Sequence, residues 1–224
     1  MTRMDYGETR ASGRFSKTEI RDIAISVAVL ALAFMLVFAA RNNSFIMTAF
    51  EKTFGEGAMS YLGLFLACVV LVVISFLFHE LGHKITAQKL GYWSEYRMFP
   101  AGLAFTLILS FAGFLFAAPG AVMIAGNLDT KSNGRISIAG PAVNMVFAAI
   151  GIVGCLLTNG SMLVVPFYLL ASLNASLGLF NLIPIPPLDG SKVIKWNVGI
   201  WIAALAVCAV EFIGLMRLGL YYMA

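Results

Sequence analysis

The chain alternates long apolar runs with short polar connections. Six runs approach the roughly 20 residues that an α-helix needs to cross a bilayer, and they span residues 23–40, 59–78, 101–126, 136–157, 162–185 and 198–223. Little sequence remains for a soluble domain. The pattern predicts an α-helical integral membrane protein with about six transmembrane helices.

Composition strengthens this interpretation. Hydrophobic residues make up 60% of the chain and charged residues only 12%, which is far from the balance of a soluble domain. The formal net charge of +4 comes from Lys and Arg beside the apolar runs, where such charges set orientation and do not indicate nucleic-acid binding. The three cysteines lie inside apolar runs without CxxC spacing, so neither a disulfide framework nor a thiolate metal site is expected.

Polar and apolar stretches also predict the domain organisation. Residues 1–22 are polar, and no small-residue cleavage site follows the first apolar run, so we expect a short cytoplasmic N-terminal tail. Residues 23–224 form one transmembrane core. Its expected parts are a helix at 58–90, a re-entrant or extended region at 92–126, a segment at 162–190 that contains Asp189, and a last helix at 196–223.

A His-Glu-x-x-His pentad, HELGH, stands at residues 79–83, directly after an apolar run. On a helix, His79 and His83 share a face, so two imidazoles can converge on one metal ion while Glu80 acts as base toward a metal-activated water. They are the only two histidines of the chain, and an unpaired carboxylate at membrane depth costs about 2.5 kcal/mol or more. A metal site is therefore favoured over a chance match.

A catalytic zinc site needs a third protein ligand. The acidic residues near apolar runs are few: Asp129, Asp189, Glu95 and Glu211. Asp189 stands out because it lies in NLIPIPPLDG, residues 181–190, where prolines end an apolar helix. Membrane proteins tolerate such freed backbone groups only where the segment is buried in protein or lines a wet cavity. Asp189 is the preferred third ligand.

Two of these motifs carry a resemblance. HELGH in an apolar segment, followed later by Asn-x-x-Pro-x-x-x-x-Asp-Gly at residues 181–190, resembles the site-2 protease family of intramembrane zinc metalloproteases. AGPAVN, residues 139–144, is similar to the Gly-Pro-x-x-Asn that opens the family's next helix. Together the motifs extend the resemblance over residues 58–195, which is most of the chain.

The resemblance implies one zinc ion per chain, bound by His79, His83 and Asp189, with Glu80 as the general base. It also implies that Asn181 lies near the scissile carbonyl, where its amide stabilises the developing oxyanion. The alternative for Asn181 is an amide that packs helices together.

Further residues in the apolar segments are candidates for substrate contact or gating. They are Asn144 and Pro184, which belong to the motifs, and Glu211, an intramembrane carboxylate with a gating or water-path role as the functional hypothesis. For Asn144 and Asn174, helix packing is the favoured interpretation. Glu211 is alternatively solvated or paired, for instance with Arg217.

Charge predicts the topology. Positive residues are frequent in the N-terminal tail and directly after HELGH, which places both on the cytoplasmic side together with the metal site. Asp189 must reach the same metal, so the chain must cross the membrane an even number of times between His83 and Asp189. The runs 101–126, 136–157 and 162–185 would give three crossings. The first of these is the best candidate for a segment that does not cross, because PAG, Gly113 and APG interrupt it.

In the family this region carries short extended segments, and residues 96–100 and 119–126 suit them. Residues 101–118 are longer and more apolar than the resemblance leads us to expect, so they are a re-entrant hairpin, a membrane-surface helix or a lid beside the substrate. An exposed strand edge would hold an unwound substrate by pairing with it. We hypothesise that one of these extended segments does so.

The function predicted from the sequence is a zinc metalloendopeptidase that hydrolyses peptide bonds in or near transmembrane segments of membrane-protein substrates, as in regulated intramembrane proteolysis. Its partners are those substrates and the lipid bilayer, and the resemblance places the substrate route between the first and last helices. A short chain without targeting signals suits a prokaryotic cell membrane. The alternatives are a metal transporter, disfavoured because the ligands form one compact cluster with Glu80 beside it, and a catalytically inactive homologue that binds membrane segments.

Overall fold

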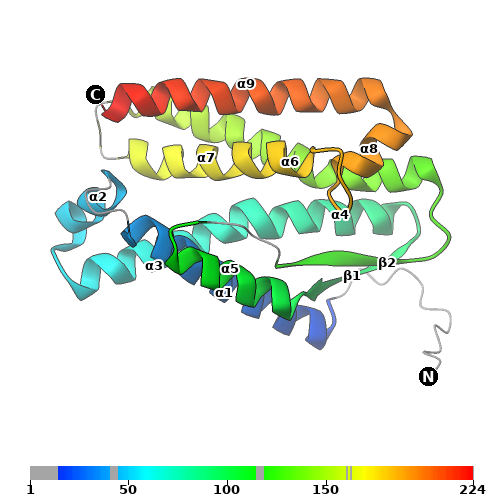
Figure 1. Ribbon diagram of the computed structural model, residues 1–224, viewed down its shortest axis with the longest axis horizontal. Coiled ribbons are helices and arrows are strands. Elements are labelled where there is room, and N and C mark those ends of the chain that lie inside the picture. Colours follow the sequence, from blue (N-terminus) through cyan, green and yellow to red (C-terminus); the bar gives the residue numbers. More distant parts are fainter. Residues whose placement is uncertain (1–14, 41–44, 115–118, 160, 162, 224) are drawn as a thin grey trace.

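A computed structural model describes residues 15–40, 45–114, 119–159, 161 and 163–223. Helices dominate it (Figure 1). They are α1 Lys17–Ala40, α2 Phe45–Phe54, α3 Ala58–Val72, α4 Phe78–Lys89, α5 Pro100–Phe111, α6 Thr130–Leu157, α7 Val164–Asn181, α8 Gly190–Trp196 and α9 Val198–Met223, with the π-helical turn η1 Val73–Leu77 joining α3 to α4. Two strands, β1 Trp93–Met98 and β2 Gly120–Ala125, complete the fold.

Five helices of the described part are long and apolar enough to cross a membrane: α1, the continuous helix α3–η1–α4, α6, α7 and α9. The expected count of about six is therefore not confirmed. The difference lies in residues 101–126, where α5 has only 12 residues. At 1.5 Å per residue α5 is about 18 Å long, short of the roughly 30 Å hydrocarbon core. Gly113 follows its C-cap with a φ of 78°, a left-handed conformation that stops the helix.

The long helices form two groups with α4 between them (Figure 1). In one group α6 packs on α7, and α9 covers α7; in the other, α1 packs on α3 and α5. Small residues allow the close approach of α6 and α7, since a Cβ at Gly151 would lie 2.6 Å from the backbone nitrogen of Ala171. Helix α4 contacts α6 on one side and β1 on the other, so the HELGH helix joins the two groups.

The strands form one antiparallel pair, with Trp93 opposite Ala125 and Met98 opposite Gly120. The prediction of extended segments in this region is confirmed, with β1 beginning three residues before the expected start at 96. Helix α5 lies between the two strands in sequence and packs along α1. The end of the connection, residues 115–118, lies outside the described residues.

The path from HELGH to Asp189 agrees with an even number of crossings. Helices α6 and α7 run antiparallel beside each other (Figure 1), and α5 is too short to add a third crossing. The chain therefore returns after α7 to the end of the molecule where α4 ends. At the N-terminus, α1 begins at Lys17, so residues 17–22 of the expected tail are helical, while 1–14 lie outside the described residues.

Candidate metal centre

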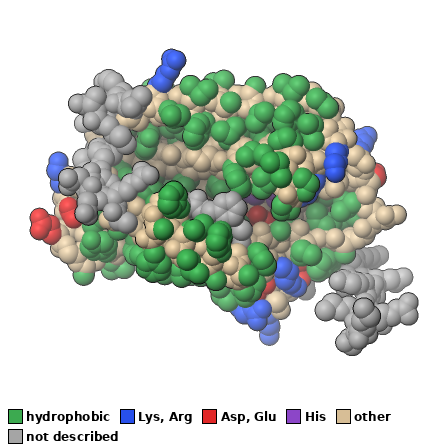
Figure 2. Space-filling view, in the orientation of Figure 1, with side chains coloured by type: hydrophobic (Ala, Val, Ile, Leu, Met, Phe, Trp, Pro, Cys, Tyr) green, Lys and Arg blue, Asp and Glu red, His purple; other side chains and the backbone are tan. Residues whose placement is uncertain are grey.

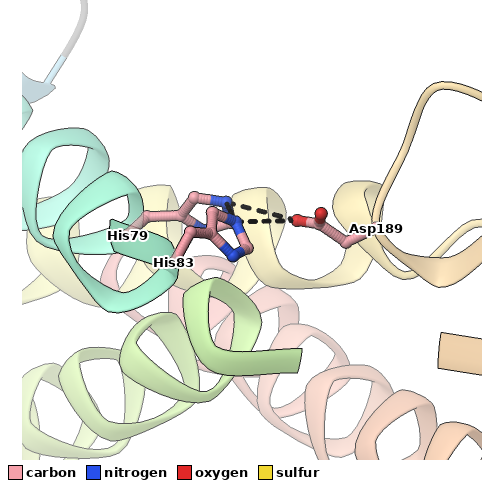
Figure 3. Close-up of side chains that lie close together, drawn as sticks. All are labelled: His79, His83 and Asp189. Carbon is pink, nitrogen blue, oxygen red and sulfur yellow. Dashed lines mark hydrogen bonds and ion pairs between the residues drawn. The ribbon is translucent and has the colours of Figure 1, made fainter. Parts of the chain in front are cut away.

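The HELGH helix α4 places His79 and His83 one turn apart, both with their rings directed toward the same point (Figure 3). Their Nε2 atoms are 3.0 Å apart, and both residues are buried. This shared face follows from the four-residue spacing on a helix of 3.6 residues per turn.

Asp189 approaches the two histidines from the segment between α7 and α8 (Figure 3). Its Oδ2 lies 3.1 Å from Nε2 of His83 and 3.4 Å from Nε2 of His79. The three side chains thus bring one ligand atom each within 4.8 Å of one another, and all three residues are buried. Of the four acidic candidates from the sequence, Asp189 is the one that the structure places against the histidine pair.

The other three acidic candidates have different surroundings. Glu95 pairs with Arg97 on β1. Asp129 is the N-cap of α6 and accepts a hydrogen bond from the Ser132 backbone, which holds the pKa of its carboxyl below the usual value. Glu211 lies on α9 and is absent from the lining of the cavity at the metal centre. These three residues do not supply a ligand to the cluster.

Hydrogen bonds determine which nitrogen of each imidazole is free. Nδ1 of His79 donates to the side-chain oxygen of Asn144 at 2.6 Å, and Nδ1 of His83 donates to the carbonyl oxygen of Ile136 at 2.7 Å. Both partners are oxygens that only accept, so in the neutral rings the proton sits on Nδ1 and the lone pair on Nε2. This is the tautomer that a metal-binding histidine needs.

The donor set fits a zinc ion. Two imidazole lone pairs and a carboxylate oxygen face one another in a buried site, an arrangement that calls for a cation between them. Two nitrogens and one oxygen are ligands typical of catalytic zinc, with a fourth position left for water. Gly140 on α6 provides the space, because a Cβ there would lie within 2.6 Å of Nε2 of His79 and closer still to Nε2 of His83.

Asn144 joins His79 to the interior of the helix bundle. Its side-chain nitrogen donates to the backbone oxygen of Ser75 at 2.9 Å and to the side-chain oxygen of Asn174 at 2.8 Å. Asn174 in turn donates to the hydroxyl of Ser75 at 2.9 Å. Ser75 belongs to the π-helical turn η1, a feature that is frequent at functional sites. The two amides do connect helices, as expected, and Asn144 in addition contacts a candidate ligand.

The second carboxylate oxygen of Asp189 faces a cation. Oδ1 lies 3.6 Å from Nζ of Lys192, three residues further on. Oδ2 of Asp189 is directed toward the Nε2 atoms of His79 and His83, so the carboxylate and the two imidazoles present three acceptor atoms to one another.

Glu80 lies beside this cluster with one oxygen unused. The backbone of Val122 on β2 makes a hydrogen bond to its carboxylate, while Oε2 is buried and has no hydrogen-bond partner among the described residues. A buried carboxylate oxygen without a partner is costly unless a ligand or water completes it. Both Glu80 and the three candidate ligands line one cavity of about 320 Å³.

The cavity lies between the two helix groups. Leu30 and Phe34 of α1 form one wall, and Leu177 and Phe180 of α7 form another. Figure 2 shows hydrophobic side chains over most of this face, with a histidine visible in the recess between the groups. The polar side chains of the metal centre thus line a cavity in a molecule whose outer face is largely apolar.

The remaining sequence candidates differ in position. Asn181 lines the same cavity, and its Nδ2 donates one hydrogen bond to the backbone oxygen of Leu177 at 3.0 Å. Pro184 is exposed and is not among the residues that line the cavity. Glu211 has an Oε2 atom that is buried without a hydrogen-bond partner in the described part of the chain. The structure thus brings Asn181, but neither Pro184 nor Glu211, to the metal centre.

Sequence reasoning missed three contributors to the site: Gly140, Ser75 and Lys192. Gly140 belongs to the quoted AGPAVN motif, so its position was a usable signal, and Lys192 closely follows Asp189. Ser75 gave a weaker signal, as one small polar residue in an apolar run. The roles of Gly140 and Ser75 depend on contacts between helices that spacing along one helix does not predict, whereas Lys192 pairs with Asp189 three residues before it.

Comparisons with known proteins agree on one family. The family model described as Peptidase family M50 matches residues 154–206. "Putative zinc metalloprotease MJ0611" of Methanocaldococcus jannaschii is 38% identical over 206 residues, covering 91% of this chain and 95% of that protein. "Zinc metalloprotease MJ0392" of the same organism is 32% identical over 133 residues, 56% of this chain and 32% of that protein. "Putative zinc metalloprotease YwhC" of Bacillus subtilis is 31% identical over 149 residues, 57% of this chain and 67% of that protein. No solved structure matches the chain significantly.

Proposed function

Because this chain belongs to peptidase family M50, the site-2 protease family of zinc metalloproteases, we propose that it hydrolyses peptide bonds in or near transmembrane segments of membrane-protein substrates. The observation that carries the proposal is the convergence of His79, His83 and Asp189 beside an unpartnered oxygen of Glu80. We assign one zinc ion per chain to the three converging atoms. When bound, zinc supplies Lewis-acid activation of water and of the scissile carbonyl.

Glu80 is assigned as the general base. Its Oε2 has no hydrogen-bond partner in the part of the chain that the structure describes, so it is available to take a proton from the attacking water and to return it to the leaving amine. The hydrogen bond from Val122 restrains the carboxylate. Burial beside the cavity keeps bulk water from competing for the same oxygen.

Asn181 is assigned to the scissile carbonyl. Its side-chain nitrogen carries two hydrogens, and one is used by the backbone of Leu177. The other is available to donate to the oxygen on which charge develops, an interaction that strengthens in the transition state. The alternative, helix packing alone, predicts that replacing Asn181 changes stability and leaves kcat unaltered.

The β2 edge is the proposed binding place for the unwound substrate. Gly120, Val122 and Ile124 line the cavity, and pairing with a strand edge holds a peptide extended. Proline substitutions at Gly120, Val122 and Ile124, within residues 119–126, remove the N–H groups that such pairing uses. Cleavage that survived all of them would refute this part of the proposal.

Orientation and location complete the proposal. We place the N-terminus and the metal centre on the cytoplasmic side of a prokaryotic cell membrane, because positive charges along the sequence are frequent in the N-terminal tail and directly after HELGH. Lys89, in the last turn of α4, is one of the positive residues on which this orientation is based. The substrates are membrane proteins with a transmembrane helix, which reach the cavity from the bilayer.

A metal transporter is the second candidate, and the described residues favour it less. A transport route needs a succession of ligand sites across the membrane. Within the described residues, His79, His83 and Asp189 form the one group able to hold a metal. A carboxylate oxygen beside that group without a partner among the described residues has its use chiefly in hydrolysis, as a general base.

The test is cleavage of a panel of single-span model substrates by the purified protein in detergent. The wild type is compared with Glu80→Gln and with chelator-treated protein, and the zinc content of each sample is measured. We expect cleavage within or beside the span, lost by about 10²-fold or more in Glu80→Gln with zinc retained. Zinc-loaded wild type that cleaves no member of a broad panel would overturn the assignment.

A further inference from the structure

One face of α1 carries three buried polar residues. Glu19, Asp22 and Ser26 follow one another at spacings of three and four, which places them on the same side. All three are buried, and Glu19 is 0% exposed. Buried polar side chains need partners, so this face must meet polar groups elsewhere in the molecule.

The partners are on strand β1. Oε1 of Glu19 accepts a hydrogen bond of 2.9 Å from the backbone N–H of Tyr96, and Oδ2 of Asp22 accepts a longer one of 3.4 Å from the N–H of Met98. The hydroxyls of Ser26 and Tyr96 are 2.9 Å apart. Carboxylates of α1 thus occupy the positions at which a third strand would accept hydrogen bonds from β1. This edge of the sheet is closed by side chains.

The opposite edge then belongs to β2. In an antiparallel pair, residues directly opposite each other point their N–H groups both inward or both outward. Tyr96 and Met98 point theirs outward to α1, so their partners Val122 and Gly120 also point away from β1. The hydrogen bond between the Val122 backbone and Glu80 agrees with this direction. Among the described residues, the β2 edge of the sheet therefore has no neighbouring strand, and through Val122 it contacts Glu80 at the metal centre.

Glu19 also contacts the helix that carries the candidate ligands. Both of its oxygens lie 2.6 Å from Nζ of Lys84, the residue after His83, and the ion pair is buried. The ring of Phe15 covers the ammonium group at 4.3 Å, and Ser94 of β1 donates to the Lys84 carbonyl at 3.2 Å. One carboxylate therefore connects α1, α4 and β1.

From this arrangement we infer that Glu19 is a substrate-positioning residue: by capping β1 and binding Lys84, it holds the open edge of β2 at a set distance from Glu80. The inference rests on the proposed function, because it assumes that an extended substrate pairs with β2. Without the cap, β1 and β2 are free to shift together relative to α4. Substrate binding would then weaken while the metal centre and its chemistry stay intact.

The test compares two double variants, because Glu19→Gln alone leaves Lys84 as a buried unpaired charge and risks misfolding. In Glu19→Gln/Lys84→Met the ion pair is gone, but an amide oxygen remains to accept from Tyr96. In Glu19→Leu/Lys84→Met the acceptor is gone as well. The two proteins differ in the strand cap alone. Glu56→Gln, an exposed carboxylate on the connection before α3, serves as the control.

We expect amide hydrogen exchange in peptides covering β1 and β2 to be at least about tenfold faster in Glu19→Leu/Lys84→Met than in Glu19→Gln/Lys84→Met. The KM for a single-span substrate should rise about threefold or more between the same two variants, with kcat and zinc content unchanged. Equal exchange and equal KM in the two variants would overturn the inference, and so would lost zinc or a lower kcat with KM unaltered.

Failure of the proposed function is distinguishable from failure of the inference. If the zinc-loaded wild type cleaves no substrate, the protease assignment fails at that step, and substrate positioning fails with it. The exchange comparison needs no activity, so it still decides whether Glu19 caps β1. If the wild type cleaves and the two double variants behave alike, the inference alone is wrong.

Discussion

The side-chain oxygen of Asn144 accepts a hydrogen bond of 2.6 Å from Nδ1 of His79. The two residues come from different helices, α6 and α4, and lie 65 positions apart in the chain. The contact holds the His79 proton on Nδ1 and turns the Nε2 lone pair toward His83 and Asp189. An amide that helps to pack helices therefore also prepares a metal ligand.

Replacing this amide tests its role. We expect Asn144→Ala to weaken zinc binding by about 10- to 100-fold, because the His79 ring loses the partner that orients it. Competition titration against a chelator of known affinity measures the change. Asn197→Ala removes an exposed asparagine that caps α9 and should bind zinc as the wild type does. Equal zinc affinity of Asn144→Ala and wild type would show that the hydrogen bond does not support the ligand.

The space at Gly140 gives a second prediction. A methyl group there would lie within 2.6 Å of both imidazole Nε2 atoms, so Gly140→Ala should abolish stoichiometric zinc binding. The matched control is Gly214→Ala on α9, where a Cβ meets nothing within 4 Å. That variant should bind zinc normally and gain up to about 1 kcal/mol of helix stability. Metal analysis of the purified proteins decides between the two outcomes.

Removal of zinc should lower thermal stability. An ion that binds the folded chain alone stabilises it by about 2.7 kcal/mol at a free concentration 100 times the Kd. A chelator should therefore lower the Tm of the wild type and of Glu80→Gln, and added zinc should restore it. Asp189→Asn, which weakens the ligand set, should show little response to either. If neither the chelator nor added zinc changed the Tm of the wild type, that result would contradict the proposed site.

Glu211 gives a prediction away from the metal centre. Its Oε2 is buried without a partner among the described residues, and an unsatisfied buried polar group costs about 1–3 kcal/mol. We expect Glu211→Leu to raise the Tm and to leave cleavage unaltered, because Glu211 does not line the cavity. A loss of cleavage with zinc retained would instead favour the gating or water-path role considered from the sequence, and Glu211→Gln would then show whether the charge matters.

The sequence alone determined those features that depend on spacing along one segment. The helical period places His79 and His83 on one face, and the proline-rich segment marks Asp189 as a residue at the end of a helix. Interruptions made residues 101–126 the best candidate for a segment that does not cross, and the extended segments beside them were expected on family resemblance. Such features are local, so hydrophobic patterning and backbone chemistry are sufficient to predict them.

Only the tertiary structure decided the contacts between helices. Residues Glu19 and Asp22 belong, by composition, to a polar tail, yet they are buried against β1 because α1 extends to Lys17. Gly140 and Asn144 reach the histidines because α6 packs against α4 in one particular rotation. Apolar side chains surround a membrane helix on nearly all sides, so their distribution does not specify which side faces a neighbouring helix. The packing of small residues and the buried hydrogen bonds determine which side of each helix faces its neighbour. Both form only when the helices assemble.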